Sequence, residues 1–188
     1  MPSAPPRATA QAALPGEPDR ETLLARIIRV DHAGEYGARR IYEGQLAILG
    51  NRRTGPVIKH MLEQELHHLA TFENLMVDRR VRPTMLQPVW HVGAFMLGAA
   101  TALLGERAAM ACTVAVETVI DEHYAEQAAK LGDDEAELRT TVEQFRAEEV
   151  EHRNIGLAHE AEKAPAYPLL SALIKTGTRV AIALSERI

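Results

Sequence analysis

Two short motifs constrain this chain more than any other feature. Glu65-Leu66-His67-His68 and Glu149-Val150-Glu151-His152 each open with a glutamate and end with a histidine three residues later. Of the eight histidines, only His68 and His152 have a glutamate at this spacing. On an α-helix, positions i and i+3 lie on one face about one turn apart. A carboxylate and an imidazole placed in this way can bind one metal ion together.

Both motifs lie on apolar stripes with helical spacing. The first stripe consists of Ile58, Met61, Leu62, Glu65, His68, Leu69, Phe72, Leu75 and Met76, and the second of Val142, Phe145, Glu149, His152, Ile155 and Gly156. Two further glutamates precede the motifs. Glu35 lies on a mixed apolar and acidic stripe, and Glu117 lies in the apolar run 112–120, where an unpaired carboxylate would be costly.

Turn residues divide the chain into six expected helices. The first helix is expected from Asp19 or Glu21 to Leu49, the second from after Pro56 to the break at Arg82-Pro83, and the third from Leu86 to Leu104. The fourth is expected from Glu106 to just before Gly132, the fifth from a cap at Asp133-Asp134 to Pro165, and the sixth from Tyr167 to Ile188. Segment 86–104 has no Lys, Arg, Asp or Glu and has the length of a marginal membrane span. Pro88, His91 and several small residues favour a buried or membrane-lying helix instead. His91 is expected to be a core residue or, alternatively, to lie near a ligand.

The two halves of the chain are similar in layout. Glu35 and Glu117 lie 82 positions apart, and both residues of the Glu-x-x-His motifs recur after 84 positions. We therefore predict an all-α, ferritin-like four-helix bundle of two tandem helical-hairpin repeats, each followed by an extra apolar helix. The repeats would span about 21–107 and 108–188 of a single domain, and residues 1–20, rich in Pro and Ala, would form a disordered tail.

Composition excludes several classes of protein. The chain has 188 residues and a net charge of −5, which is no footprint for nucleic-acid binding. Its single cysteine, Cys112, excludes an internal disulfide and a cysteine-rich zinc or iron–sulfur site. The N-terminal segment has no apolar core of a secretory signal and is a poor mitochondrial transit peptide, because it has few Arg residues and includes Glu17 and Asp19. A cytoplasmic, bacterial-type protein is favoured.

A metal site with six ligands follows from these patterns. The predicted ligands are Glu35, Glu65, His68, Glu117, Glu149 and His152. Carboxylates and imidazoles suit iron or manganese, and four glutamates neutralise two divalent ions. A single Glu-x-x-His is more often a pair of ordinary helix residues, but two of them at repeat-related positions favour a dinuclear centre. Two readings stay open for Asp31, Asp121, His123 and Tyr124, which either hold the ligand histidines from behind or simply pack in the bundle.

At these residues the chain closely resembles the demethoxyubiquinone hydroxylases, the di-iron monooxygenases of ubiquinone biosynthesis. The resemblance covers essentially everything after about residue 22. The matching stretches include RVDHAGEYGA at 29–38, QELHH at 64–68, RPTML at 82–86, LGAATALLG at 97–105, MACTVAVE at 110–117, EEVEHRNIGL at 148–157 and RVAIALSER at 179–187.

The resemblance implies two iron ions per chain, bridged by Glu65 and Glu149, with Glu35 and His68 on one iron and Glu117 and His152 on the other. It also implies an isoprenoid quinol substrate, O2, and an external reductant such as NADH. Family members lie peripherally on the membrane that holds the quinone pool. That membrane would be the bacterial inner membrane on its cytoplasmic face or, alternatively, the mitochondrial inner membrane on its matrix side.

Other classes and partners stay open. A ferritin-like iron-storage protein would need similar ligands, and a non-catalytic quinone- or lipid-binding bundle would keep the apolar helices. The two apolar segments, 86–104 and 167–184, are expected to lie near each other. They would dock on the membrane or on another subunit of a homo-oligomer. Other proteins of ubiquinone biosynthesis are further candidate partners.

Overall fold

The computed structural model describes residues 18–188, which form six α-helices, two short 3-10 helices and no strand. The α-helices are α1 (Arg20–Leu49), α2 (Gly55–Asp78), α3 (Gln87–Leu103), α4 (Glu106–Lys130), α5 (Ala136–Ala158) and α6 (Tyr167–Ser185). The 3-10 helices are η1 (Asp133–Glu135) and η2 (Ala161–Lys163). Most of the predicted tail lies outside the described residues, and α1 already begins at Arg20, capped by the Asp19 side chain.

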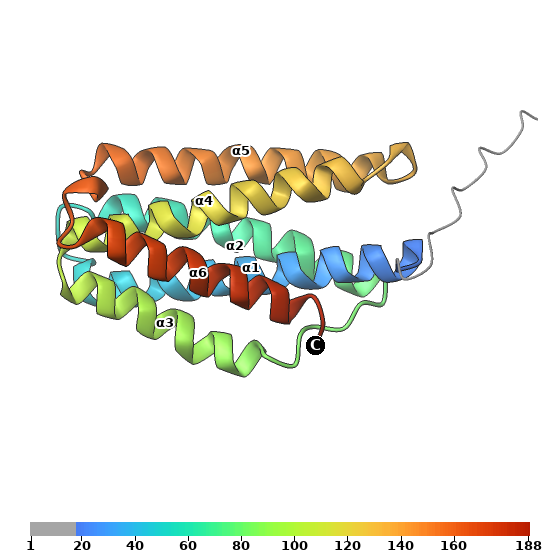
Figure 1. Ribbon diagram of the computed structural model, residues 1–188, viewed down its shortest axis with the longest axis horizontal. Helices are drawn as coiled ribbons and strands as arrows, with labels where there is room; N and C mark the ends of the chain where they lie inside the picture. The colour runs from blue at the N-terminus through green and yellow to red at the C-terminus, as the bar shows by residue number, and fades with distance from the viewer. Residues whose placement is uncertain (1–17) are drawn as a thin grey trace, which may run out of the picture.

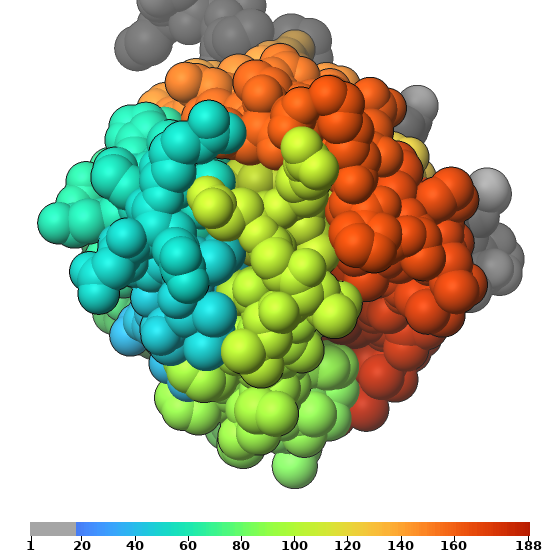
Figure 2. Space-filling view, turned by 90° about the vertical axis from the view of Figure 1, so that its left-hand side faces the viewer, coloured from blue at the N-terminus to red at the C-terminus, as the bar shows by residue number. Residues whose placement is uncertain are grey.

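Four long helices, α1, α2, α4 and α5, run side by side as a bundle, with α3 against α1 and α6 against α4 (Figure 1). Figure 2 views the end of the molecule where the α1–α2, α3–α4 and α5–α6 connections gather. The predicted all-α bundle with two additional apolar helices is therefore confirmed. Its description as a tandem repeat stays a prediction.

The bundle has an apolar cluster toward each end. One cluster contains Tyr42 and Met61, and the other contains Ile28 and Phe72. Along α1 and α2, the predicted metal ligands fall between these positions. The polar site is thus held between two apolar layers, which keep water away from it.

Two helices end earlier than their following prolines suggest. α2 ends at Asp78 and α5 at Ala158, and each is followed within two residues by a left-handed residue, Arg80 at φ 54° and Glu160 at φ 62°. A left-handed residue just after a helix ends its hydrogen-bond ladder. The expectation that Pro83 and Pro165 end these helices is therefore wrong by several residues.

The expected Asp133-Asp134 cap is also wrong. These residues belong to η1, and α5 starts after Glu135 without a side-chain cap. The carboxylates of Asp134 and Glu135 form ion pairs with other elements instead. Asp134 accepts from Arg20 on α1 (2.9 Å), and Glu135 accepts from the guanidinium of Arg79 after α2 (2.8 and 2.9 Å).

Helix α3 lies unusually close to α1. A Cβ added to Gly98 would lie 2.0 Å from the Ile41 carbonyl oxygen, and one added to Gly44 would lie 2.2 Å from the Phe95 carbonyl oxygen. Only glycine allows the two backbones to approach so closely. His91, near the start of α3, is exposed, so the expectation that it is a core residue is wrong. Its Nδ1 instead lies 2.6 Å from the Tyr36 hydroxyl.

Within the described residues, none of the helices combines the length and apolarity needed to cross a membrane.

Candidate metal centre

The six predicted ligand side chains come together inside the bundle, and each is at most 3% exposed. They are Glu35 on α1, Glu65 and His68 on α2, Glu117 on α4, and Glu149 and His152 on α5. The i, i+3 spacing places each glutamate and histidine of a motif on the inward face of its helix, as the apolar stripes predict.

The six residues form two overlapping groups of four. One group contains Glu35 and His68, the other contains Glu117 and His152, and both contain Glu65 and Glu149. Within each group, one ligand atom from each residue lies within 4.8 Å of all the others. Each group could hold a metal ion, and Glu65 and Glu149 belong to both groups.

Glu149 lies between the two imidazoles. Its Oε1 lies 3.1 Å from Nδ1 of His68, and its Oε2 lies 3.1 Å from Nδ1 of His152. The same two nitrogens approach the other carboxylates, since His68 Nδ1 lies 3.3 Å from Glu35 Oε2 and His152 Nδ1 lies 3.2 Å from Glu65 Oε1. Both histidines therefore direct Nδ1 into the centre.

Two buried tyrosines hold Glu35 and Glu117, the outer glutamates, each of which belongs to only one of the two groups. The Tyr42 hydroxyl donates to Oε1 of Glu117 (2.9 Å), and the Tyr124 hydroxyl donates to Oε1 of Glu35. Each tyrosine follows one of these glutamates by seven residues in sequence but binds the other one. The two bonds thus tie α1 to α4 in both directions and fix the orientation of both carboxylates.

Several buried polar atoms of the predicted ligands have no hydrogen-bond partner. They include Oε2 of Glu35, Oε2 of Glu117, both oxygens of Glu65, and Nδ1 of His68. Each outer glutamate is therefore held through one oxygen and keeps the other free, whereas Glu65 keeps two. A buried polar atom without a partner is costly, and coordination of a metal ion would satisfy all five. The donor set of carboxylates and imidazoles fits iron or manganese.

The imidazoles are held on their outer side as well. Nε2 of His68 lies 2.8 Å from Oε2 of Glu148, and Nε2 of His152 lies 3.0 Å from Oε1 of Gln64. Because a carboxylate only accepts, Nε2 of His68 carries the hydrogen, and its Nδ1 is left to bind a metal.

The buried charges perturb one another. Burial raises the pKa of Glu65 and Glu117 well above 4.5, and the nearby Glu149 carboxylate raises both further. Burial alone would raise the pKa of Glu149, but the two adjacent imidazoles lower it to about 2. Burial alone would lower the pKa of His68, but the surrounding carboxylates, Glu149 first, raise it to about 12. The metal-free centre thus holds protons that a divalent ion would displace.

None of the four residues considered as partners of the ligand histidines bonds to either histidine. Tyr124 contacts a predicted ligand, but the ligand is Glu35 and not a histidine. Asp31 accepts from Gln127 (2.6 Å), and His123 is also bonded to Gln127. Asp121 accepts from two arginines, at 2.6 and 2.7 Å, between α4 and α5.

The actual histidine partners, Gln64 and Glu148, could have been found from sequence. Each immediately precedes the glutamate of a Glu-x-x-His motif, and the two lie 84 positions apart, as the motifs do. Tyr42 carries a similar signal, since it recurs as Tyr124 at the 82-residue offset of the outer glutamates. A search for every repeated polar residue, rather than for ligand types alone, would have identified them.

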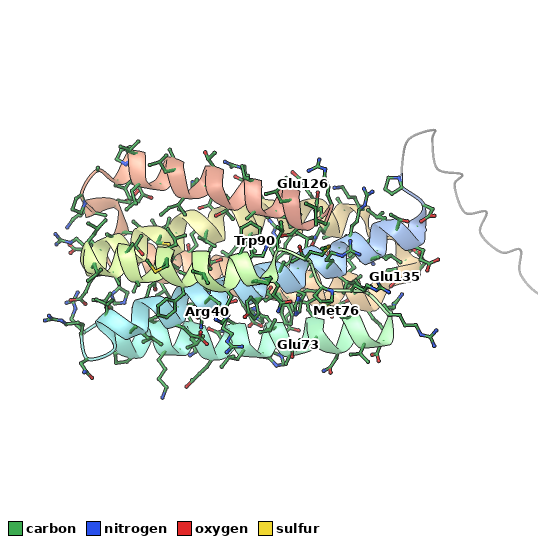
Figure 3. All side chains as sticks on the ribbon, turned by 90° about the horizontal axis from the view of Figure 1, so that it is seen from below. Arg40, Glu73, Met76, Trp90, Glu126 and Glu135 are labelled. Carbon is green, nitrogen blue, oxygen red and sulfur yellow. The ribbon has the colours of Figure 1, made fainter. Side chains whose placement is uncertain are left out.

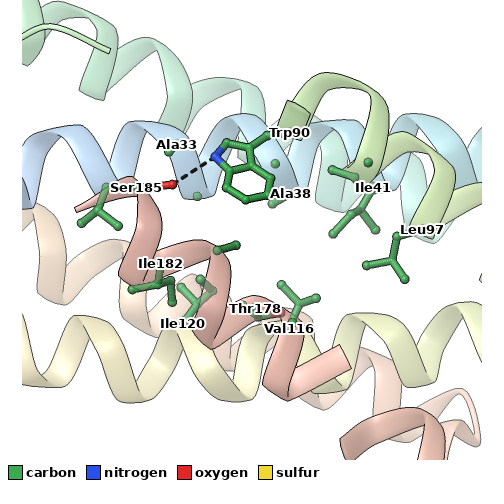
Figure 4. Close-up of a pocket in the computed structure, with 17 residues that line it drawn as sticks. Ala33, Ala38, Ile41, Trp90, Leu97, Val116, Ile120, Thr178, Ile182 and Ser185 are labelled. Carbon is green, nitrogen blue, oxygen red and sulfur yellow. Dashed lines mark hydrogen bonds between the residues drawn. The ribbon is translucent and has the colours of Figure 1, made fainter. Parts of the chain in front are cut away.

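Two cavities lead to the centre. A small one, of about 20 Å³, is lined by the four predicted glutamate ligands together with Asp31, His123 and Tyr124. A larger apolar one, of about 200 Å³, lies between α3 and α6 above α1 and α4 (Figure 4). The two share the lining residues Val30, Gly34, Ala38, Ile120 and Ile182, so they adjoin.

Trp90 and Ser185 close one end of the larger cavity. The Trp90 indole on α3, labelled in Figure 3, donates to the Ser185 hydroxyl on α6 (3.0 Å), so the two apolar helices are joined there (Figure 4). The expectation that these helices lie near each other, beside the centre, is therefore confirmed.

Fold and site together define a helical-bundle protein with a buried carboxylate–histidine centre that can hold metal ions. Residues 22–185 match the family described as Ubiquinone biosynthesis protein COQ7. The chain belongs to this family, as the resemblance in its motifs indicated.

Relatives in three organisms agree with this assignment. The 3-demethoxyubiquinol 3-hydroxylase of Rhodospirillum rubrum is 57% identical over 183 residues, which cover 97% of this chain and 86% of the relative. The human protein named NADPH-dependent 3-demethoxyubiquinone 3-hydroxylase, mitochondrial, is 57% identical over 167 residues, which cover 87% of this chain and 77% of the human protein. The Dictyostelium discoideum protein of the same name is 53% identical, with coverages of 90% and 79%.

Proposed function

We propose that this protein is a di-iron monooxygenase that hydroxylates the ring of a demethoxyubiquinol-type isoprenoid quinol with O2, in ubiquinone biosynthesis. The observation that carries the proposal is the pair of overlapping ligand groups that share Glu65 and Glu149. The names of the relatives, demethoxyubiquinol and demethoxyubiquinone 3-hydroxylases, support the reaction and the substrate.

In this proposal Glu35 and His68 would hold one iron, Glu117 and His152 would hold the other, and Glu65 and Glu149 would serve both. When bound, the iron pair supplies the reductive activation of O2, which no amino-acid side chain performs. The protein supplies orientation and dryness. Tyr124 and Tyr42 hold the outer carboxylates, and the apolar layers on both sides exclude water.

The adjoining cavities suggest how the quinol lies. Its ring would lie in the larger cavity where this adjoins the small one beside the carboxylates, and its apolar tail would extend between α3 and α6. Ala33, Gly37 and Gly93 line that larger cavity. Small side chains leave room for an isoprenoid chain, and the lining has little polarity to bind a charged ligand.

Exposed apolar residues on the same two helices support contact with a membrane surface. On α3 they include Val92 and Met96, 60% and 58% exposed, and on α6 they include Leu173 and Val180, 64% and 53% exposed. A water-insoluble tail could then pass from the bilayer into the cavity without crossing water. Peripheral binding to the membrane that holds the quinone pool, such as the cytoplasmic face of a bacterial inner membrane, is part of the proposal. The competing use of this surface is an interface with a second copy or another protein.

The electrons that re-reduce the irons come from an external donor. The names of the human and Dictyostelium relatives contain "NADPH-dependent", which favours a nicotinamide. We propose NADPH or NADH, bound without a Rossmann motif, because the sequence contains no G-x-G-x-x-G.

The test is a single turnover. Protein loaded anaerobically with Fe(II) is incubated with a demethoxyquinol and then exposed to isotope-labelled O2. The quinone product is analysed by mass spectrometry. We expect about two irons per chain and one labelled oxygen in the ring. Glu63→Gln, a change at an exposed position of α2, is the matched control and should behave as wild type.

Three outcomes would contradict the proposal. Label that arrives from water would exclude a monooxygenase, and iron uptake into a mineral core without quinol turnover would support the storage alternative. Quinol binding without iron or turnover would support the non-catalytic alternative.

A further inference from the structure

The outer hydrogen bonds of the two histidines are exchanged between the halves of the chain. His68 is held by Glu148 from α5, and His152 is held by Gln64 from α2. Each acceptor therefore comes from the helix that carries the other histidine. In both cases the bond holds Nε2 and leaves Nδ1 directed into the centre.

The two acceptors differ in charge. Glu148 is a carboxylate, and its second oxygen accepts from the Gln144 side chain at 3.1 Å. Gln64 is a neutral amide. The centre therefore has a fifth carboxylate behind His68 and none behind His152, although the six ligands themselves are arranged alike at both positions.

The surroundings of the two rings differ as well. The His68 ring stacks on Phe145 with centroids 4.0 Å apart, whereas the His152 ring meets Tyr42 edge-on at 6.1 Å. The stacked Phe145 holds the His68 ring in the plane that its bond to Glu148 requires. An imidazole whose N–H donates to a carboxylate is a stronger electron donor to a metal than one bonded to an amide.

We propose that Glu148 and Gln64 are positioning residues that make the two metal positions unequal. The position of Glu35 and His68 then favours the more highly charged ion, and the position of Glu117 and His152 favours the ferrous one. The inference rests on the proposed di-iron function and adds a direction to it: the iron beside His68 is oxidised first and reduced last.

The experiment exchanges the two acceptors. Glu148→Gln, Gln64→Glu and the double exchange each keep an acceptor for both histidines, so ring orientation is preserved. Iron content is measured first, followed by stepwise reduction potentials and the Mössbauer spectrum of the half-reduced form. Glu151→Gln, which removes a negative charge from an exposed position of α5, is the matched control.

The expected shifts have opposite signs. Glu148→Gln should raise the lower potential and Gln64→Glu should lower the higher one, so that either single change brings the two steps together. The double exchange should separate them again. Changes to second-shell groups alter metal affinity by about 10–100-fold. Applied to the ratio of ferric to ferrous affinity, this corresponds to shifts of about 60–120 mV for one electron.

Two results would overturn the inference alone. Variants that bind two irons and turn over quinol but keep both wild-type potentials would show that the acceptors do not distinguish the positions. Shifts of the same sign in both single variants, not restored by the double exchange, would indicate a merely structural role. A wild-type protein that binds no iron pair would overturn the proposed function itself, and this inference with it.

Discussion

Tyr42→Phe removes one hydroxyl from the centre and leaves the packing of the ring in place. Tyr42 is 1% exposed, and its hydroxyl donates to Oε1 of Glu117, whose Oε2 has no partner. The substitution therefore leaves both oxygens of a buried carboxyl group without a donor. It also frees this side chain to turn away from the position that a metal ion would occupy.

The cost depends on whether metal is bound. In the metal-free protein, burial raises the pKa of Glu117 and so favours its neutral form, and a hydrogen bond to a neutral group is worth about 1 kcal/mol. Metal binding ionises Glu117, and a hydrogen bond to a charged group contributes about 1.5–3 kcal/mol. The difference, about 0.5–2 kcal/mol, should appear as a loss of metal affinity of about 2–30-fold.

Thermal melting and metal titration separate the two parts. For a domain of this size, about 1 kcal/mol corresponds to a fall of about 2–4 °C in the melting temperature. The metal-free variant should show a fall of this size and the metal-loaded variant a larger one. Tyr36→Phe is the control, because its hydroxyl bonds to the exposed His91 and not to the centre. Equal losses in the metal-free and loaded forms, with unchanged metal affinity, would refute the reasoning.

Three further predictions concern pH, packing and the membrane. Metal-free protein should lose stability as pH rises above 4.5, because burial raises the pKa values of Glu65 and Glu117 and they keep protons that the unfolded chain releases. It should lose stability again above pH 6.5, because the carboxylates around His68 raise its pKa to about 12. The slope should be about 1.4 kcal/mol per pH unit for each such proton, and urea unfolding in which metal-free stability rises with pH would contradict it. Gly98→Ala should cost about 1–3 kcal/mol by overpacking, because its Cβ would meet the Ile41 carbonyl; an unchanged unfolding midpoint would show that α3 can move away from α1 freely. Met96→Glu should reduce liposome binding and turnover of long-tailed quinol while sparing iron content and turnover of a short-tailed analogue, and normal flotation with liposomes would refute membrane docking through α3.

The elements and the ligand cluster were predictable because their signals are local. An i, i+3 motif on an apolar stripe has one inward face, so His68 and Glu65 point to the core wherever the helix packs. The pairing of the halves followed from the equal offsets of Glu149 and His152. The structure brings these residues together as predicted, and their role as iron ligands stays a proposal.

The features that were missed depend on contacts between distant segments. Asp134 pairs with Arg20 and does not cap α5 as expected. No local sequence pattern specifies an ion pair between residues 114 positions apart. His91 was assigned to the core from the apolarity of its neighbours. An apolar helix that lies on the surface has one exposed face, and the sequence alone does not distinguish such a helix from a buried one.

The exchanged contacts have a consequence for assembly. Each half of the chain contains its own glutamates and histidine, but the groups that orient them come from the other half. Glu35 depends on Tyr124, and His68 depends on Glu148. A hairpin of α1 and α2 by itself would thus carry ligands without the bonds that direct Oε2 and Nδ1 inward. It would also lack Glu149, which lies between the two imidazoles. An ordered metal centre therefore requires that α1–α2 and α4–α5 have already packed together, so tight metal binding reports the assembly of the whole bundle and not the folding of either hairpin.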